Sequence, residues 1–164
     1  FYKGGVVAYV AANRRSGFVA AHKDQTRTAV WSYKRLKPAT ATSNAIGQGL
    51  ANTTRLVQEI DALDDPGNAQ YGYAAKVSAD FVLNGYDDWA LPSINELAQL
   101  FKVREAVGGF NLDGKYWSSS VSTAGYTYRY FFDVDSPNPQ YYDLNQESPS
   151  GVRSIRNISA SVAW

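Results

Sequence analysis

Basic side chains are concentrated in the first third of the chain, and their spacing is the strongest chemical signal in the sequence. Lys34, Arg35 and Lys37 stand within four positions, and Lys23 and Arg27 precede them. Arginine offers planar, bidentate hydrogen-bond donors and lysine a mobile point charge, so several together can hold sulfate or carboxylate anions. These residues predict a surface that captures an anionic polymer. The alternative is a solvated surface whose charge is balanced by acids nearby.

Four further cations could extend this surface or lie elsewhere. Arg14 and Arg15 fall in the polar turn 13–16 between two expected strands, at the exposed tip of a hairpin. Lys102 and Arg104 fall on the exposed side of an expected helix. The residues predicted to contact an anionic ligand are therefore Arg14, Arg15, Lys23, Arg27, Lys34, Arg35, Lys37, Lys102 and Arg104.

The net charge of +1 conceals a strong asymmetry along the chain. Residues 1–55 carry nine Lys or Arg against one acid, Asp24, which gives +8. Residues 56–164 carry seven bases and fourteen acids, which gives −7. Such polarity predicts an electropositive face, unless folding brings the two halves together.

Catalytic and cofactor-binding patterns have little support in this sequence. The chain has no Cys and a single His, His22, which excludes thiolate chemistry and multi-His metal sites. It contains no Gly-x-Ser-x-Gly elbow, phosphate loop or dinucleotide-binding glycine pattern. Adjacent acids at 64–65 and 87–88 are typical of caps and turns. We interpret the protein as a non-enzyme that needs no cofactor.

Composition and periodicity predict one α+β domain that covers residues 1–164. Aromatic residues make up 14% of the chain and charged residues 19%, which favours a folded, strand-rich protein over a disordered one. No apolar run is long enough to span a bilayer. We expect strands at 6–10, 17–21, 30–33, 116–121, 126–134, 140–144 and 152–158 and three helices at 47–62, 74–83 and 93–107.

The third helix has the clearest local signals. Ser93 is a good N-cap and Glu96, three residues later, completes a capping box. Gly108 and Gly109 should end the helix, because glycine supplies a left-handed residue after the last turn. Between the expected hairpin and the first helix, Trp31 stands in a long loop and is expected to anchor the core.

Several ordered motifs carry a family resemblance. They are the opening Tyr2–Val7, Gly17–Ala21 followed by Asp24-Gln25, Asp88-Trp89-Ala90-Leu91-Pro92-Ser93 with Glu96-Leu97, Gly108-Gly109-Phe110, Tyr116-Trp117-Ser118-Ser119 and Val152-Arg153-Ser154-Ile155-Arg156. Together they resemble the C-terminal domain family of bacterial, Legionella-type collagen-like adhesins. The resemblance spans nearly the whole chain.

This resemblance implies a C-type-lectin-like fold with antiparallel sheets, on a protein that is secreted or displayed on the bacterial surface and associated with the outer membrane. It also implies a homotrimer that binds sulfated glycosaminoglycans of the heparin, heparan sulfate or chondroitin sulfate type. Neither nucleic acid nor membrane insertion is expected. Arg153 and Arg156 close the motif set, and we expect them to form structural ion pairs with acids such as Asp87 or Asp88.

Two other functions stay open. The first is a lectin that binds neutral or calcium-chelated sugar through aromatic residues and the loop 133–139, which is rich in oxygen-bearing side chains. Because Ser136-Pro137-Asn138 stands where sugar-binding lectins have Glu-Pro-Asn, we expect a proline-ordered turn without metal. The second is a trimerisation or protein-interaction cap. The alternating Tyr126, Tyr128 and Tyr130, with Tyr141 and Tyr142, could stack on sugar or form a subunit interface.

Overall fold

Two β-sheets of different size combine strands from distant parts of the chain. The computed structural model describes residues 1–133, 135–136 and 139–159. The three-stranded antiparallel sheet has the order β1-β2-β8, formed by β1 (Val6–Val10), β2 (Ser16–Ala20) and β8 (Ile155–Ser159). The five-stranded sheet has the order β3-β7-β4-β5-β6, formed by β3 (Thr26–Ala29), β4 (Lys115–Val121), β5 (Thr127–Phe131), β6 (Gln140–Asp143) and β7 (Ser150–Val152).

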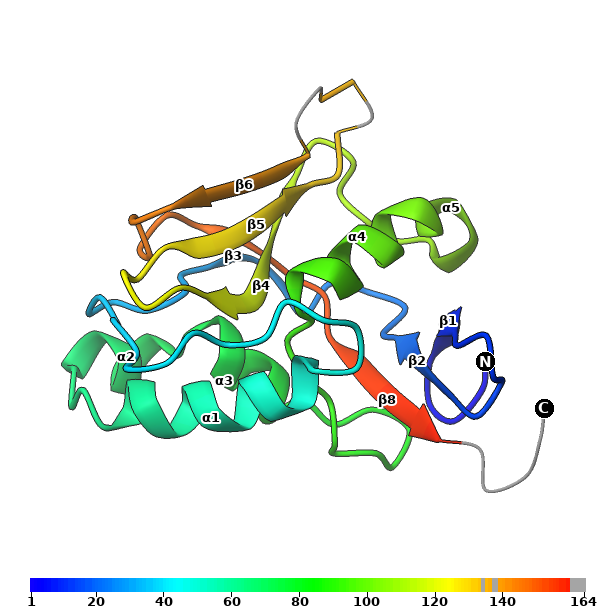
Figure 1. Cartoon of the computed structure of the whole chain (residues 1–164), viewed down its shortest axis with the longest axis horizontal. Coiled ribbons are helices and arrows are strands. Elements are labelled where there is room, and N and C mark those ends of the chain that lie inside the picture. Colours follow the sequence, from blue (N-terminus) through cyan, green and yellow to red (C-terminus); the bar gives the residue numbers. More distant parts are fainter. Residues whose placement is uncertain (134, 137–138, 160–164) are drawn as a thin grey trace.

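Five helical segments flank the larger sheet (Figure 1). They are α1 (Gly49–Asp61), α2 (Pro66–Tyr71), α3 (Ala74–Ala79), α4 (Ile94–Lys102) and α5 (Arg104–Val107). In Figure 1, α1, α2 and α3 lie below the sheet, and α4 and α5 lie beside it. The β4–β7 pair is parallel and the other pairs are antiparallel, so the protein is a mixed α+β fold.

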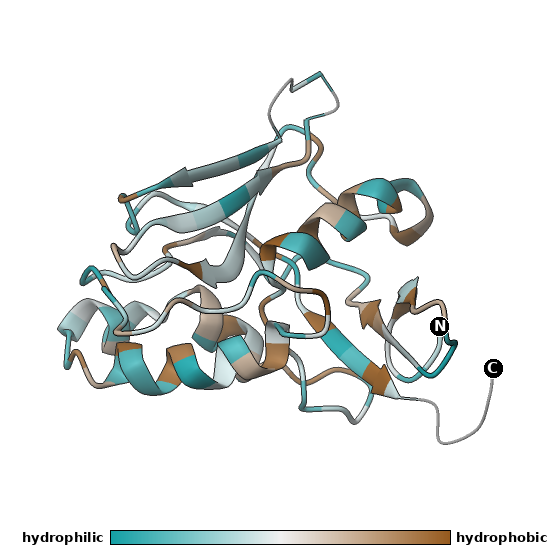
Figure 2. Cartoon of the chain, in the orientation of Figure 1, coloured by the Kyte–Doolittle hydropathy of each residue, from teal (hydrophilic) through white to brown (hydrophobic). Residues whose placement is uncertain are grey.

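Side-chain alternation along β4 divides the core into two parts. Successive strand residues point to opposite faces of a sheet, so Trp117 and Tyr116 face different helices. Trp117 packs in one cluster with Leu56 and Ile60 of α1. Tyr116 packs in another with Leu97 of α4. Brown apolar positions recur along α1 between teal polar ones, as expected of a helix with one buried side (Figure 2).

The capping box at the start of α4 is confirmed. The Ser93 backbone N–H donates to the Glu96 carboxylate at 2.7 Å, and the Ser93 hydroxyl accepts from the Glu96 N–H at 3.3 Å. The expected continuous helix to residue 107 is wrong in one respect. The helix is interrupted at Val103, where φ is −108° and ψ is 14°, before the short α5 begins.

Four other expectations need correction. The strand expected at 30–33 is wrong, because β3 ends at Ala29 and the Trp31 indole instead donates to the Ser118 carbonyl at 2.9 Å. The expected strand 152–158 is two strands in different sheets. The expected helix 74–83 ends at Ala79, and α2 was not expected. Asp65 caps α2 by accepting from two backbone N–H groups.

Candidate functional site

Three arginines of the C-terminal half, Arg129, Arg153 and Arg156, form ion pairs within the fold. Arg153 is completely buried, and its Nε donates to Asp24 Oδ1 at 2.9 Å. Arg156 pairs with Asp88, and Arg129 pairs with Asp143. The expected ion-pair role of Arg153 and Arg156 is therefore confirmed. The expected acid is right for Arg156 but wrong for Arg153.

Asp24 contacts basic side chains from both of the oppositely charged parts of the chain. Besides Arg153, it contacts Arg27 at 3.4 Å and accepts from the Tyr116 hydroxyl at 2.9 Å. The only acid of residues 1–55 is thus neutralised by a base of the C-terminal half as well as by Arg27. Arg27 is exposed, but it already has a carboxylate partner. This makes Arg27 less available to an external anion than the exposed cations that follow it.

Lys34, Arg35 and Lys37, which we call the basic segment, are all exposed around a buried Leu36. The side chain of Gln146 is buried, and its amide group hydrogen-bonds both backbone polar groups of Leu36. Its Oε1 accepts from the Leu36 N–H at 2.8 Å, and its Nε2 donates to the Leu36 carbonyl at 2.9 Å. Burial of Leu36 directs its two neighbours toward solvent.

Each cation of the basic segment has its own surroundings. Lys34 Nζ donates to the Leu63 carbonyl at 3.1 Å, just beyond the end of α1, where helix carbonyls attract a cation. Two acids, Asp64 and Asp65, follow Leu63 directly and reduce the local positive potential. Arg35 instead donates to the Ala124 carbonyl at 2.8 Å, in the turn between β4 and β5.

Lys37 lies on that same turn. A Cβ added to Gly125 would lie 3.2 Å from both Arg35 Nε and Lys37 Cγ. Six of the sixteen Lys and Arg residues form ion pairs, which leaves ten. The basic segment belongs to these ten, since none of its cations lies within 4.0 Å of a carboxylate in the described part of the chain.

The other predicted contact residues lie elsewhere. Arg14 and Arg15 are exposed in the β1–β2 turn, as expected, and Lys23 is exposed after β2. Lys102 is exposed at the end of α4, whereas Arg104 covers the Phe101 ring at 4.2 Å. In Figure 1, α4, α5 and the β1–β2 hairpin lie at the opposite end of the molecule from α2. Within one chain the nine cations therefore form separate groups.

Tyrosines lie on and just before β5 and on its neighbour β6, beside the β4–β5 turn. Tyr126 and Tyr142 are 37% and 60% exposed, and their ring centroids are 5.8 Å apart. Tyr128 is half-buried, and its ring is also 5.8 Å from that of Tyr142. We call these three residues the tyrosine cluster. Tyr130, the third of the alternating tyrosines, does not belong to this exposed group, because it is buried against Phe101 of α4.

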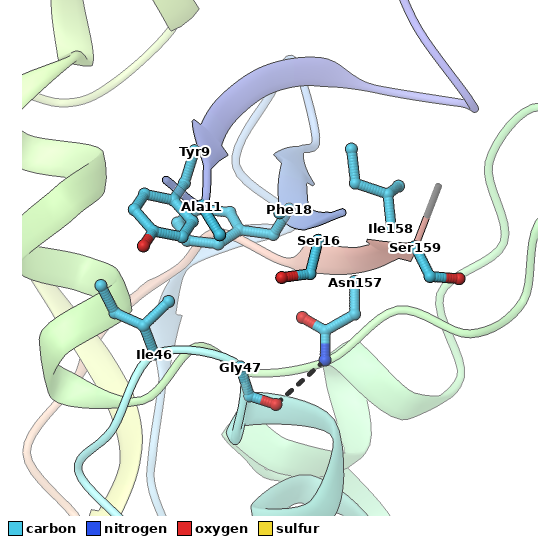
Figure 3. Close-up of a pocket in the computed structure, with 10 residues that line it drawn as sticks. Tyr9, Ala11, Ser16, Phe18, Ile46, Gly47, Asn157, Ile158 and Ser159 are labelled. Carbon is cyan, nitrogen blue, oxygen red and sulfur yellow. Dashed lines mark hydrogen bonds between the residues drawn. The ribbon is translucent and has the colours of Figure 1, made fainter. Parts of the chain in front are cut away.

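A pocket of about 460 Å³ lies between the three-stranded sheet and the loop before α1 (Figure 3). The rings of Tyr9 and Phe18 stack at 5.6 Å on one side of it. Ser16 and Ser159 contribute hydroxyl groups, and Asn157 donates to the Gly47 carbonyl at 3.2 Å. None of the described residues that line it is Lys, Arg, Asp or Glu. Its lining comes from three distant segments, so sequence spacing could not have revealed it.

The described residues include no group of three or more His, Asp or Glu side chains placed to hold a metal ion. In the loop considered as a calcium site, the Asp133 carboxylate accepts from the Asp135 N–H at 2.9 Å. Val134, Pro137 and Asn138 of that loop lie outside the described residues.

In the described chain, no helix combines the length and the apolar character that crossing a membrane requires. No protein-family model matches the sequence, and no match was found among curated proteins.

Proposed function

We propose that this chain is a non-enzymatic adhesin domain that binds sulfated glycosaminoglycans through exposed lysine and arginine side chains. One observation carries the proposal. The basic segment presents three exposed cations that lack a carboxylate within 4.0 Å among the described residues, on a backbone held in place by Gln146. A fixed group of exposed cations without a directly paired carboxylate is suited to a polymer with regularly spaced anions.

Electrostatic capture would be the mechanism. Sulfate groups remain anionic at all physiological pH values, and arginine binds them through paired N–H donors. Exposed charges are screened over about 8 Å at physiological ionic strength, so each contact is weak and several must act together. A homotrimer would present three basic segments to one polysaccharide and thereby raise the effective affinity.

From the sequence motifs we also propose a C-type-lectin-like fold, a homotrimer and a location at the bacterial surface. The three-stranded sheet is compatible with the fold assignment, because β8 from the end of the described chain pairs with β2 from its beginning. Strands from the beginning and from the end of the described chain thus form one sheet.

A second candidate function is binding of a neutral sugar, and the pocket in Figure 3 favours it. Tyr9, whose ring stacks on the buried Phe18, offers an apolar surface to the C–H groups of a sugar ring, and Ser16 and Asn157 offer polar groups to its hydroxyls. Such a site needs no charge. Neutral-sugar binding should therefore be nearly independent of salt, whereas glycosaminoglycan binding should weaken steeply.

Titration calorimetry with heparin at two salt concentrations tests the proposal. The double variant Arg35→Glu, Lys37→Glu should lower the affinity at least about tenfold at low salt, because each reversal replaces an attraction by a repulsion. Lys76→Glu on α3 is the control, since Lys76 already pairs with Asp80 at 3.2 Å. Equal losses in both variants, or wild-type affinity that salt leaves unchanged, would contradict the proposal.

A further inference from the structure

The fold brings the basic segment and the tyrosine cluster to one end of the molecule. Arg35 donates to the Ala124 carbonyl, two residues before Tyr126 in the same turn. Tyr126 in turn contacts Tyr142 of β6, with ring centroids 5.8 Å apart at an interplanar angle of 80°. In Figure 1 this end of the sheet lies above α2. The basic segment and the tyrosine cluster therefore both adjoin the β4–β5 turn.

The β4–β5 turn that joins the two groups is held in a defined conformation. Gly125 has φ of +82°, and a Cβ there would lie 2.8 Å from the Leu36 carbonyl oxygen, so this position requires glycine. The Gly125 N–H donates to the Ser122 carbonyl at 2.9 Å, and Gln146 Nε2 donates to the Gly125 carbonyl at 3.0 Å. The same Gln146 side chain thus holds both the turn and the basic segment.

Anionic sugars combine the two chemical features that this surface could recognise. The face of a pyranose ring carries C–H groups that pack on an aromatic ring, and its sulfate or carboxylate groups pair with cations. Tyrosine adds a hydroxyl that can donate to or accept from a sugar hydroxyl. A polyanion without sugar rings could use only the cations.

We propose that Arg35, Lys37, Tyr126 and Tyr142 form one composite subsite for a sulfated or uronate pyranose unit. This inference rests on the proposed function and specifies its ligand as a sugar rather than any polyanion. Arg35 and Lys37 bind the anionic groups, and the two tyrosines contact the ring. The right-angled arrangement of the tyrosine rings leaves more than one ring surface for the sugar.

An acid stands next in the chain to Gln146, whose side chain holds the turn and the basic segment. Glu147 follows Gln146 directly, is exposed, and has no cation within 4.0 Å among the described residues. The other nearby acid, Asp143, is already paired with Arg129. Glu147 therefore weakens anion binding at the subsite, and Glu147→Gln should raise affinity for both a sugar polyanion and a polyanion without sugar.

The test compares a heparin octasaccharide with inorganic polyphosphate, which has similar charge but no sugar ring. Tyr126→Ala and Tyr142→Ala should each lower heparin affinity about fivefold, as expected for the loss of one aromatic contact, and leave polyphosphate affinity unchanged. Tyr141→Ala is the matched control, because Tyr141 is exposed on the opposite face of the same strand. Thermal melts identify variants that remain folded.

The outcomes separate this inference from the proposed function. If wild-type protein does not bind heparin, the proposed function fails. If Arg35→Glu lowers heparin affinity while Tyr126→Ala and Tyr142→Ala do not, glycosaminoglycan binding stands and the composite subsite is refuted. Equal losses for heparin and polyphosphate in the tyrosine variants would also refute it. Loss confined to heparin in both tyrosine variants supports it.

Discussion

Arg153→Ala should lower the stability of the protein, whereas Arg35→Ala should lower its heparin affinity and leave its stability nearly unchanged. Arg153 has no exposed surface. Its guanidinium contacts Asp24 at 2.7 Å and donates to the carbonyls of Ala21 and Gly108 at 3.1 and 3.0 Å. It also lies over the Phe110 ring at 3.8 Å. Alanine would remove all of these contacts, so that the buried Asp24 carboxylate would keep only Tyr116 and the exposed Arg27 as partners and the Ala21 and Gly108 carbonyls would lose this donor.

The expected cost at Arg153 is large. Breaking a buried ion pair by removing one partner costs about 3–5 kcal/mol, much of it the burial of the remaining charge. A domain of this size has a free energy of unfolding of about 5–15 kcal/mol, so Arg153→Ala should lose a large fraction of it. The free energy of unfolding of Arg153→Lys should lie between those of wild type and Arg153→Ala, because lysine keeps the charge but lacks the planar donors.

Arg35→Ala should change stability by less than about 0.5 kcal/mol, since Arg35 is exposed and donates only to one exposed carbonyl. Its heparin affinity should fall about three- to tenfold. Urea unfolding followed by tryptophan fluorescence measures stability, because Trp31, Trp89 and Trp117 are buried. Calorimetry measures binding.

Two results would refute this reasoning. Arg153→Ala with a free energy of unfolding within about 1 kcal/mol of wild type would show that the buried network is not structural. Arg35→Ala that unfolds as readily as Arg153→Ala would show that the basic segment is needed for folding rather than free for binding.

Excess chelator should leave heparin affinity within about twofold, because a site made of cations needs no divalent ion; loss restored by calcium would favour a metal-dependent lectin. Burial and the adjacent Asp61 raise the pKa of Tyr73, and burial with nearby Asp24 raises that of Tyr116. Ultraviolet titration should therefore find both phenols protonated at about pH 11. Since unfolded tyrosine ionises near 10.0, stability should fall as pH rises above that value, and a flat profile would contradict the assignment. Light scattering should give a mass near three times 18.0 kDa, and a mass of one chain would remove the trimer. Gly17→Ala should lower the melting temperature, because its Cβ would lie 2.2 Å from the Tyr9 carbonyl oxygen.

The sequence by itself determined features that depend on neighbouring residues. The β1 strand matches its expected range, the polar turn after it is exposed, and the capping box starts α4 at Ile94. Such signals are reliable because the interacting groups are within a few positions of one another. Burial of Trp31 was also predictable, since a large aromatic side chain in a polar segment usually enters the core.

Only the tertiary structure decided how distant segments meet. Arg153 pairs with Asp24 across 129 residues, and Arg35 reaches Ala124 across 89. The period of two along β5 predicts which tyrosines share a face, but only the position of α4 buries Tyr130 and leaves Tyr126 exposed. These outcomes depend on long-range packing, which local propensity does not encode. The candidate cations were therefore visible in the sequence, whereas their separation into groups and the contact of one group with the tyrosine-bearing turn were not.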